Sequence, residues 1–350
     1  MGALGSMELA TAGCLRMIGF LAHPSPHNIQ TRDNLSGETV RPMSFGPSGK
    51  EPIMPLSRSL SRRLLFLLPP AALLTLAGTG LFGWLGLHKP LDAAEMATLY
   101  ETPRAPVEGG LSAFHLGHSL VGRDMPAMLA QMAGAEHRYD SQLGWGTTLK
   151  AHWEPDVEIA GFDTENDHPR YRDATEALES GDYDALVLTE MVEIRDAIRY
   201  FDSDRYLARW AERARANDPE IRVFLYETWH NLDDPEGWLD RVDADLDRYW
   251  IDQVLAPALA AMDETTRAPI YLVPGGQVMA AFVRRIEKTP LPGLSDRTAL
   301  FKRTPEGAQD QIHFNDHGAY LIALTHYAVL YAQSPVGLPH DLERADGTPM

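Results

Sequence analysis

Apolar positions after residue 110 fall into two alternating patterns. Short segments with strand character occur at Leu111–Leu116, His137–Leu143, Ala185–Leu188, Ile221–Tyr226 and Pro269–Val273, and several of them are continuous apolar runs. Runs of this length and composition are typical of parallel strands that are buried on both faces. The sequence therefore predicts five strands within this part of the chain.

Longer segments with helical character separate and follow the predicted strands. They lie at Pro126–Gly134, Asp173–Ser180, Asp204–Asn217, Trp238–Met262, Gln277–Lys288 and Asp316–Gln333. In the segment from Asp204, the side chains of Leu207, Trp210 and Ala214 recur at the spacing of one helical face. Strands that alternate with helices predict an α/β fold, here a three-layer α/β/α sandwich around a flavodoxin-like, five-stranded parallel sheet.

A different pattern precedes this domain. Residues 64–87 are 24 residues without a charged side chain, and Arg58, Arg62 and Arg63 come just before them. About 20 apolar residues span a bilayer, and flanking arginines favour a cytoplasmic N-terminal side. We expect a membrane anchor with the following domain outside the cytoplasm, exported and held at the inner membrane. A cleaved signal segment is the alternative, and Pro69-Pro70 argue against a buried core helix.

The remaining segments have no clear periodicity. Residues 1–63 are interpreted as a tail that ends in a basic stretch; residues 1–53 are either disordered or an over-extended gene prediction, because Met54 would be a natural start. We expect a linker at 88–110, rich in proline and glycine, a catalytic-type domain at 111–335 and a C-terminal tail at 336–350.

Charge and cysteine content exclude several classes of protein. The formal charge of −18 argues against sequence-independent binding of nucleic acid, which needs a basic surface. Cys14 is the one cysteine, so no intrachain disulfide can form. The histidines have no tight ligand spacing, so we expect no metal and no other cofactor. The sequence does not indicate an oligomeric state.

Polar residues follow the predicted strands at their carboxyl ends, where α/β folds bind ligands. Ser119 follows the first strand in Gly117-His118-Ser119, and Gly146 follows the second. A glycine at that edge can present its backbone N–H to an oxyanion. Thr189-Glu190 follow the third strand and Trp229-His230 follow the fourth.

Asp310 and His313 stand after the fifth strand and before the last predicted helix. Histidine is the usual general base near neutral pH, and a carboxylate can fix its tautomer. Together with Ser119 they supply the three side chains of a Ser-His-Asp triad. His317 is a competing base, although its helical position makes it a poorer candidate.

The set of motifs resembles the SGNH/GDSL hydrolases. Residues 114–120 are similar to the block that carries the nucleophile, 146–149 to the glycine block and 310–318 to the last block, and the likeness covers about residues 111–333. The resemblance implies Ser119 as nucleophile, His313 as base and Asp310 as its partner. It also implies an oxyanion hole that includes the backbone N–H groups of Ser119 and Gly146.

The third block departs from the family pattern. The family usually has Gly-x-Asn-Asp there, and its asparagine donates to the oxyanion, whereas this chain has Thr189-Glu190-Met191. An ionised glutamate only accepts hydrogen bonds. Three alternatives follow: donation by Thr189, a protonated Glu190, or a hole made of two backbone N–H groups.

The resemblance implies an esterase that acts on a small acyl ester through an acyl-enzyme, with O-acetyl groups on a glycan as the expected case. Glu190, Trp145, Trp229 and His230 are the candidate pocket residues, because tryptophans can stack on sugars. An O-acyltransferase with the same triad and a non-catalytic binding protein of the envelope are the alternatives.

Overall fold

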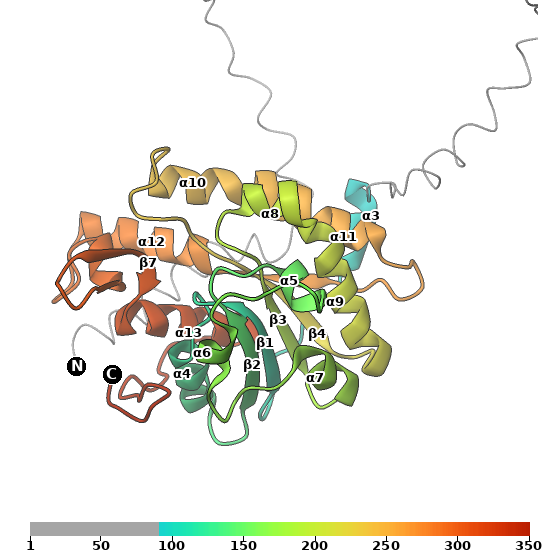
Figure 1. Ribbon diagram of the computed structural model, residues 1–350, viewed down its shortest axis with the longest axis horizontal. Helices are drawn as coiled ribbons and strands as arrows, with labels where there is room; N and C mark the ends of the chain where they lie inside the picture. The colour runs from blue at the N-terminus through green and yellow to red at the C-terminus, as the bar shows by residue number, and fades with distance from the viewer. Residues whose placement is uncertain (1–90) are drawn as a thin grey trace, which may run out of the picture. The chain divides into compact units, whose positions relative to one another are not determined.

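The computed structural model describes residues 91–350, and its centre is a five-stranded sheet (Figure 1). All neighbouring strands are parallel, in the order β2-β1-β3-β4-β5. The strands are β1 (Ser112–His118), β2 (Arg138–Gly144), β3 (Ala185–Thr189), β4 (Arg222–Glu227) and β5 (Ile270–Pro274). Each lies within two residues of its prediction at either end, and the predicted fold class is confirmed.

Helices cover both faces of this sheet. They include α4 (Asp124–Ala133), α5 (Leu149–Trp153), α6 (Phe162–Asn166), α7 (Ala174–Ser180), α8 (Ile194–Phe201), α9 (Ser203–Asn217), α12 (Gly275–Lys288) and α13 (Asp316–Leu330). The long helix predicted at 238–262 is instead α10 (Trp238–Asp245), a π-helical stretch η2 (Leu246–Leu255) and α11 (Ala256–Ala261). Pro257 has no N–H to donate, so the helical bonding pattern changes around it.

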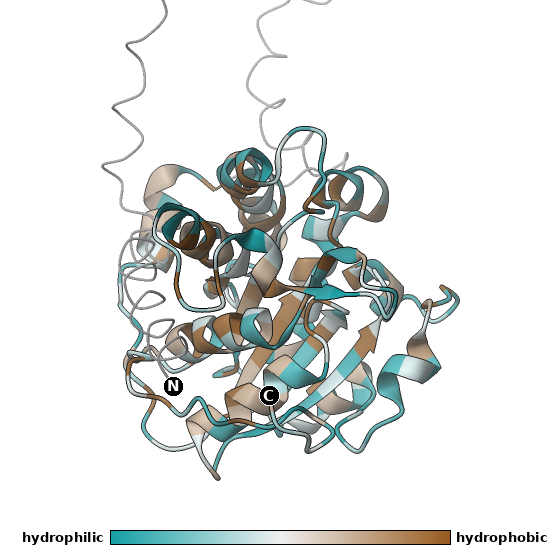
Figure 2. Ribbon diagram, turned by 90° about the vertical axis from the view of Figure 1, so that its left-hand side faces the viewer, coloured by the Kyte–Doolittle hydropathy of each residue, from teal (hydrophilic) through white to brown (hydrophobic). Residues whose placement is uncertain are grey.

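Two apolar cores result from the alternation of side chains along the strands. On β3, Ala185 and Val187 face the core formed with α4, α12 and α13, whereas Leu186 and Leu188 face the core formed with α7, α9 and α11. The brown strands at the centre of Figure 2, flanked by helices with teal outer faces, show the same arrangement. Burial of both faces explains why the central strand β3 is a continuous apolar run, whereas the edge strand β2 keeps polar residues.

The ends of the described chain pack onto the domain. The segment predicted as a linker contains α3 (Ala93–Leu99), and Tyr100 donates from its hydroxyl to the carbonyl of Ile270 at 2.7 Å. At the other end, in the predicted tail, Leu342 is buried and Arg344 pairs with Asp316 of α13. Neither segment has a periodic apolar pattern, so these contacts were not apparent from the sequence.

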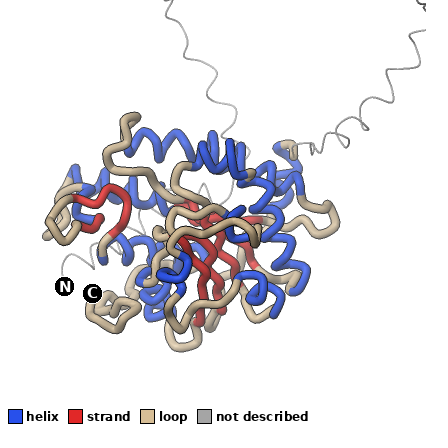
Figure 3. Tube along the Cα trace, viewed as in Figure 1, coloured by secondary structure: helices blue, strands red, loops and turns tan. Residues whose placement is uncertain are grey.

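A second sheet stands apart from the first (Figure 3). It pairs β6 (Phe301–Arg303) with β7 (Gln309–Phe314) in antiparallel orientation. The sequence patterns did not indicate these two strands.

The described residues contain no helix that is long and apolar enough to cross a membrane. The predicted span at 64–87 and the segments before it lie outside the described residues.

Candidate active site

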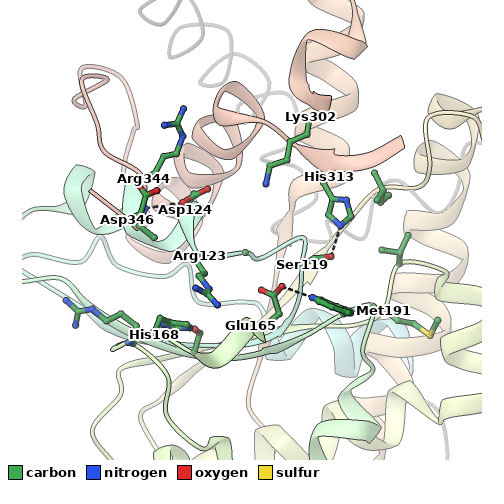
Figure 4. A pocket seen from close by; sticks show the side chains of 18 of the residues that line it. Ser119, Arg123, Asp124, Glu165, His168, Met191, Lys302, His313, Arg344 and Asp346 are labelled. Carbon is green, nitrogen blue, oxygen red and sulfur yellow. Dashed lines mark hydrogen bonds between the residues drawn. The ribbon is translucent and has the colours of Figure 1, made fainter. Parts of the chain in front are cut away.

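The structure brings Ser119, His313 and Asp310 together. Ser119 follows β1 directly, and its Oγ lies 3.0 Å from Nε2 of His313 (Figure 4). On the other side of the ring, Nδ1 of His313 lies 3.0 Å from Oδ2 of Asp310. A carboxylate can only accept, so Nδ1 carries the proton and Nε2 is left to accept from the serine hydroxyl. This is the arrangement that activates a serine nucleophile.

An irregularity in the small sheet presents Asp310 and His313. Two steps along β6, from Phe301 to Arg303, are matched by five along β7, from Gln309 to Phe314. Residues 310–313 therefore stand opposite a single residue of β6, and Asp310 and His313 are the two ends of this stretch. Such bulges commonly redirect side chains beside active sites. The competing base, His317, lies in the first turn of α13 and does not line the cavity next to Ser119.

Several hydrogen bonds fix the carboxylate of Asp310. Its Oδ1 accepts from the backbone N–H groups of Ile312 and His313, each at 2.8 Å. Partial burial raises the pKa of Asp310, but these N–H groups and the His313 ring outweigh it and hold the pKa below its ordinary value. Asp310 is therefore ionised near neutral pH and favours a protonated His313 during a reaction.

The end of β1, just before Ser119, requires glycine at position 117. A Cβ on Gly117 would lie 2.6 Å from Cβ of Thr189, closer than packed atoms can approach. The carbonyl of Gly117 accepts from Nε2 of His152 at 2.9 Å, while Nδ1 of His152 accepts from Gln142. Burial lowers the pKa of His152 to about 4, so this ring is neutral and serves as an anchor.

His118, the residue before the nucleophile, is a second neutral anchor. Its Nε2 donates to the carbonyl of Glu190 at 2.8 Å, and its Nδ1 accepts from the N–H of Leu120. Burial lowers its pKa to about 4. Residues on both sides of Ser119 are thus held by the ring, which fixes the position of the hydroxyl.

Two of the three predicted oxyanion donors line the cavity. Ser119 and Gly146 do, and Gly146 has a left-handed backbone (φ 55°) that favours glycine. Thr189 is fully buried, packs against Gly117 and does not line the cavity. The prediction of Thr189 as a donor therefore does not hold in this geometry.

Glu190 lies beneath the site rather than in the pocket. It is fully buried, and its Oε1 accepts from the N–H groups of Met191 (2.8 Å) and Leu149 (3.3 Å). Leu149 begins α5, shortly after Gly146, so the carboxyl connects the end of β3 to the glycine block. Burial raises the pKa of Glu190 to about 7, although the backbone N–H groups lower it in part. It is a positioning residue.

Trp229 was predicted to line the pocket but is fully buried. Its indole N–H donates to the carbonyl of Ile312 at 2.9 Å, and its ring contacts Phe301 and Phe314. Because Ile312 precedes His313, Trp229 supports the hairpin that carries the base. Sequence alone does not separate this role from stacking on a ligand, because both use an apolar ring with a polar N–H.

His230 was also predicted to line the pocket and is buried instead. Its Nε2 lies 3.1 Å from Asp245. His230, Glu193 and Asp234 are close enough together to resemble a metal-binding group. However, the Arg241 guanidinium contacts both carboxylates, at 3.0 Å and 2.9 Å, so the cluster already contains a cation.

A cavity of about 1130 Å³ opens beside the triad. Ser119, His313, Gly146 and Trp145 line it, as expected from the sequence. Other polar side chains that the sequence patterns did not indicate also line it: Arg123, Asp124, Glu165, His168, Asn231, Lys302, Arg344 and Asp346. Asn231 directly follows Trp229-His230, so its place after a strand was the one available signal.

No protein-family model and no curated protein sequence matches this chain. Among solved structures, the chain is similar to the crystal structure of a "putative GDSL-like lipase" from Parabacteroides merdae ATCC 43184. The two are 13% identical with a TM-score of 0.37, and the match covers 67% of this chain and 99% of that one. The arrangement of Ser119, His313 and Asp310 is observed in this chain itself.

Proposed function

We propose that the protein is a serine ester hydrolase of the SGNH type. The observation that supports this most directly is the continuous contact from Ser119 through His313 to Asp310, with 3.0 Å on each side of the ring. The anchors on Gly117 and His118 and the neighbouring cavity support it further.

In the proposed reaction, His313 Nε2 takes the proton of Ser119 as Oγ bonds to the ester carbonyl carbon. The backbone N–H groups of Ser119 and Gly146 stabilise the oxyanion. His313 then gives its proton to the alcohol oxygen as the C–O bond breaks, which leaves an acyl-enzyme. His313 next deprotonates a water molecule as the water oxygen bonds to the acyl carbon. The bond to Ser119 Oγ then breaks, the acid leaves, and His313 returns the proton to Oγ.

A small acyl group on a large alcohol fits the cavity best. Ligand pockets commonly measure about 300–1,000 Å³, so this cavity holds far more than an acetyl group. Its charged and polar lining suits a hydroxyl-rich alcohol such as a glycan. The His313 side chain is 39% exposed, so water can reach it, as hydrolysis of an acyl-enzyme requires.

Substitution of the nucleophile tests the proposal. The full-length chain should release p-nitrophenol from p-nitrophenyl acetate, and Ser119→Ala should lower kcat/KM by at least ~10³-fold. Ser295→Ala, an exposed serine that does not line the cavity, is the matched control. Equal turnover by wild type and Ser119→Ala would refute the hydrolase proposal and favour a binding protein.

Location and topology remain predictions. An exported domain would meet envelope or environmental glycans, in agreement with the proposed substrate. Protease added outside the intact inner membrane should digest the exported domain. Digestion only after lysis of all membranes would contradict the predicted topology.

A further inference from the structure

Trp145 is a large apolar side chain that the fold leaves in solvent. It is 54% exposed, lines the cavity beside the triad and immediately precedes Gly146. It also lines a second hollow of about 620 Å³. An exposed indole at this place needs a reason, because its burial elsewhere would stabilise the fold.

The indole is exposed but held in position. Its Nε1–H donates to Oε1 of Glu165 at 2.7 Å, and the Trp145 backbone N–H donates to the carbonyl of Ala160 at 2.7 Å. One side of the ring packs against Gly161, where a Cβ would lie 2.2 Å from the indole. Gly161 also has a φ of +68°, so both the space beside the indole and the backbone conformation favour glycine there. The ring therefore keeps one orientation before any ligand binds.

A rigid aromatic ring binds a ligand at low entropic cost, because few rotamers are lost on binding. The π face carries partial negative charge and attracts polarised C–H groups. A pyranose ring offers such C–H groups on its faces and hydroxyls around its edge. The cavity that Trp145 lines also supplies polar groups, among them Arg123, Glu165 and Lys302, which Figure 4 labels. A long acyl chain would offer none of these groups a hydrogen bond.

We propose that Trp145 is the stacking platform for a pyranose ring of the substrate alcohol and so selects sugar esters over simple alkyl esters. The inference rests on the proposed ester hydrolysis at Ser119. Because Trp145 adjoins Gly146, one of the proposed oxyanion donors, the stacked ring is the one that carries the ester or its neighbour in the glycan. Glu165 is a positioning residue that holds the indole.

Kinetics on two kinds of acetate ester test the selectivity. The ring esters are the mono-O-acetyl methyl pyranosides of glucose, galactose and mannose, and ethyl acetate is the ester without a ring. Trp145→Ala should lower kcat/KM on the preferred ring ester by ~10-fold more than on ethyl acetate, mainly through KM, since a lost stacking contact weakens binding by about 1.4 kcal/mol. Trp145→Phe should recover part of this difference.

Tyr200→Ala is the matched control, because Tyr200 is exposed to a similar extent (57%) but does not line the cavity. It should leave the ratio of the two ester activities unchanged. Equal losses on ring and alkyl esters in Trp145→Ala would overturn the proposal, since they would indicate a structural role alone. A preference of the wild type for hexanoyl over acetyl esters, lost in Trp145→Ala, would also overturn it.

Binding without turnover separates this inference from the proposed function. In Ser119→Ala the same ring esters should show saturation transfer to their ring C–H protons by NMR, and adding Trp145→Ala should abolish it. If none of the three sugars shows transfer, the platform proposal fails even when Ser119-dependent hydrolysis is present. If transfer occurs but hydrolysis does not depend on Ser119, the hydrolase proposal fails instead.

Discussion

Asp310 performs several tasks with one carboxylate. It accepts from two backbone N–H groups of its own strand and from the His313 ring. The fold of the bulge and the tautomer of the base therefore depend on the same side chain. A conservative substitution of Asp310 can therefore distinguish its role in holding the bulge from its role toward His313.

Asp310→Asn should lower kcat by ~10³–10⁴-fold with little change in KM. The amide Oδ1 can still accept from the backbone, so the bulge persists, but the amide does not stabilise an imidazolium as a carboxylate does. Measurement of kcat with p-nitrophenyl acetate, together with thermal unfolding, would check this. A variant within ~10-fold of wild type would show that Asp310 does not serve His313.

At the scale of residues, the sequence predicted which side chains form the candidate triad better than it predicted which side chains are buried. Ser119, His313 and Asp310 follow from their order and their place after strands. Glu190, Trp229 and His230 also follow strands, yet all three are buried. The side chain of a polar residue at the end of a strand can point into the cavity or into the protein beneath it. The direction depends on which nearby backbone groups need a hydrogen-bond partner.

At the scale of elements, the hairpin β6–β7 carries two of the three residues of the proposed triad and depends on the loop after β4. Trp229 donates to the carbonyl of Ile312, and the N–H of Leu232 donates to the carbonyl of Gln311 at 2.8 Å. These bonds join the hairpin to the main sheet on the side of Ser119. The position of the base is therefore set by an element that contributes no reacting group.

Trp229→Phe should lower kcat by ~10-fold while the fold is retained. Phenylalanine keeps an aromatic ring against Phe301 and Phe314 but cannot donate to Ile312, so His313 would sample more positions relative to Ser119. Steady-state kinetics and hydrogen exchange of the hairpin amides would check this. The matched change Trp238→Phe removes a buried indole that donates to His230 and should affect kcat less. Unchanged kcat and exchange in Trp229→Phe would contradict the prediction.

Strands such as β3 were predictable to within two residues because burial on both faces leaves a continuous apolar run, which few other elements have. The hairpin, α3 and the packed C-terminal segment were not. They attach through hydrogen bonds, ion pairs such as that between Arg344 and Asp316, and single buried side chains such as Leu342, and such contacts leave no period in the sequence.

At the scale of the whole molecule, buried histidines and buried glutamates change the free energy of unfolding in opposite directions as the pH changes. Burial lowers the pKa of His118, His137, His152 and His326 to about 4 and that of His115 well below its ordinary value. Burial raises the pKa of Glu190 to about 7 and that of Glu227 to about 8. Each group favours its neutral form in the fold.

The free energy of unfolding should therefore be largest near pH 6.5. As pH falls from about 6.5 toward 4, the unfolded chain binds protons that the buried histidines do not, so stability falls. As pH rises from about 4.5 toward 8, the unfolded chain has already released the protons that Glu190 and Glu227 retain, which also lowers stability. Below pH 6.5 the more numerous histidines determine the slope.

Urea unfolding between pH 4 and 9 would measure this profile. Glu227→Gln keeps an oxygen that can accept from the N–H of Gln277 but removes the charge, so it should flatten the decline above pH 6.5. Glu306→Gln, an exposed change, should leave the profile as it is. A stability that rises steadily from pH 6.5 to 9 in the wild type would contradict the prediction.

The C-terminal segment has a practical consequence for anyone who handles this protein. Arg344, Ala345 and Asp346 line the cavity, and the N–H of Met350 donates to the carbonyl of Leu342 at 3.0 Å, so Met350 folds back onto the segment that contains these residues. An affinity tag or fusion partner attached there would begin within a few residues of the proposed active site. We expect purified protein with such an extension to lose activity on large substrates but to keep full activity on a small chromogenic ester.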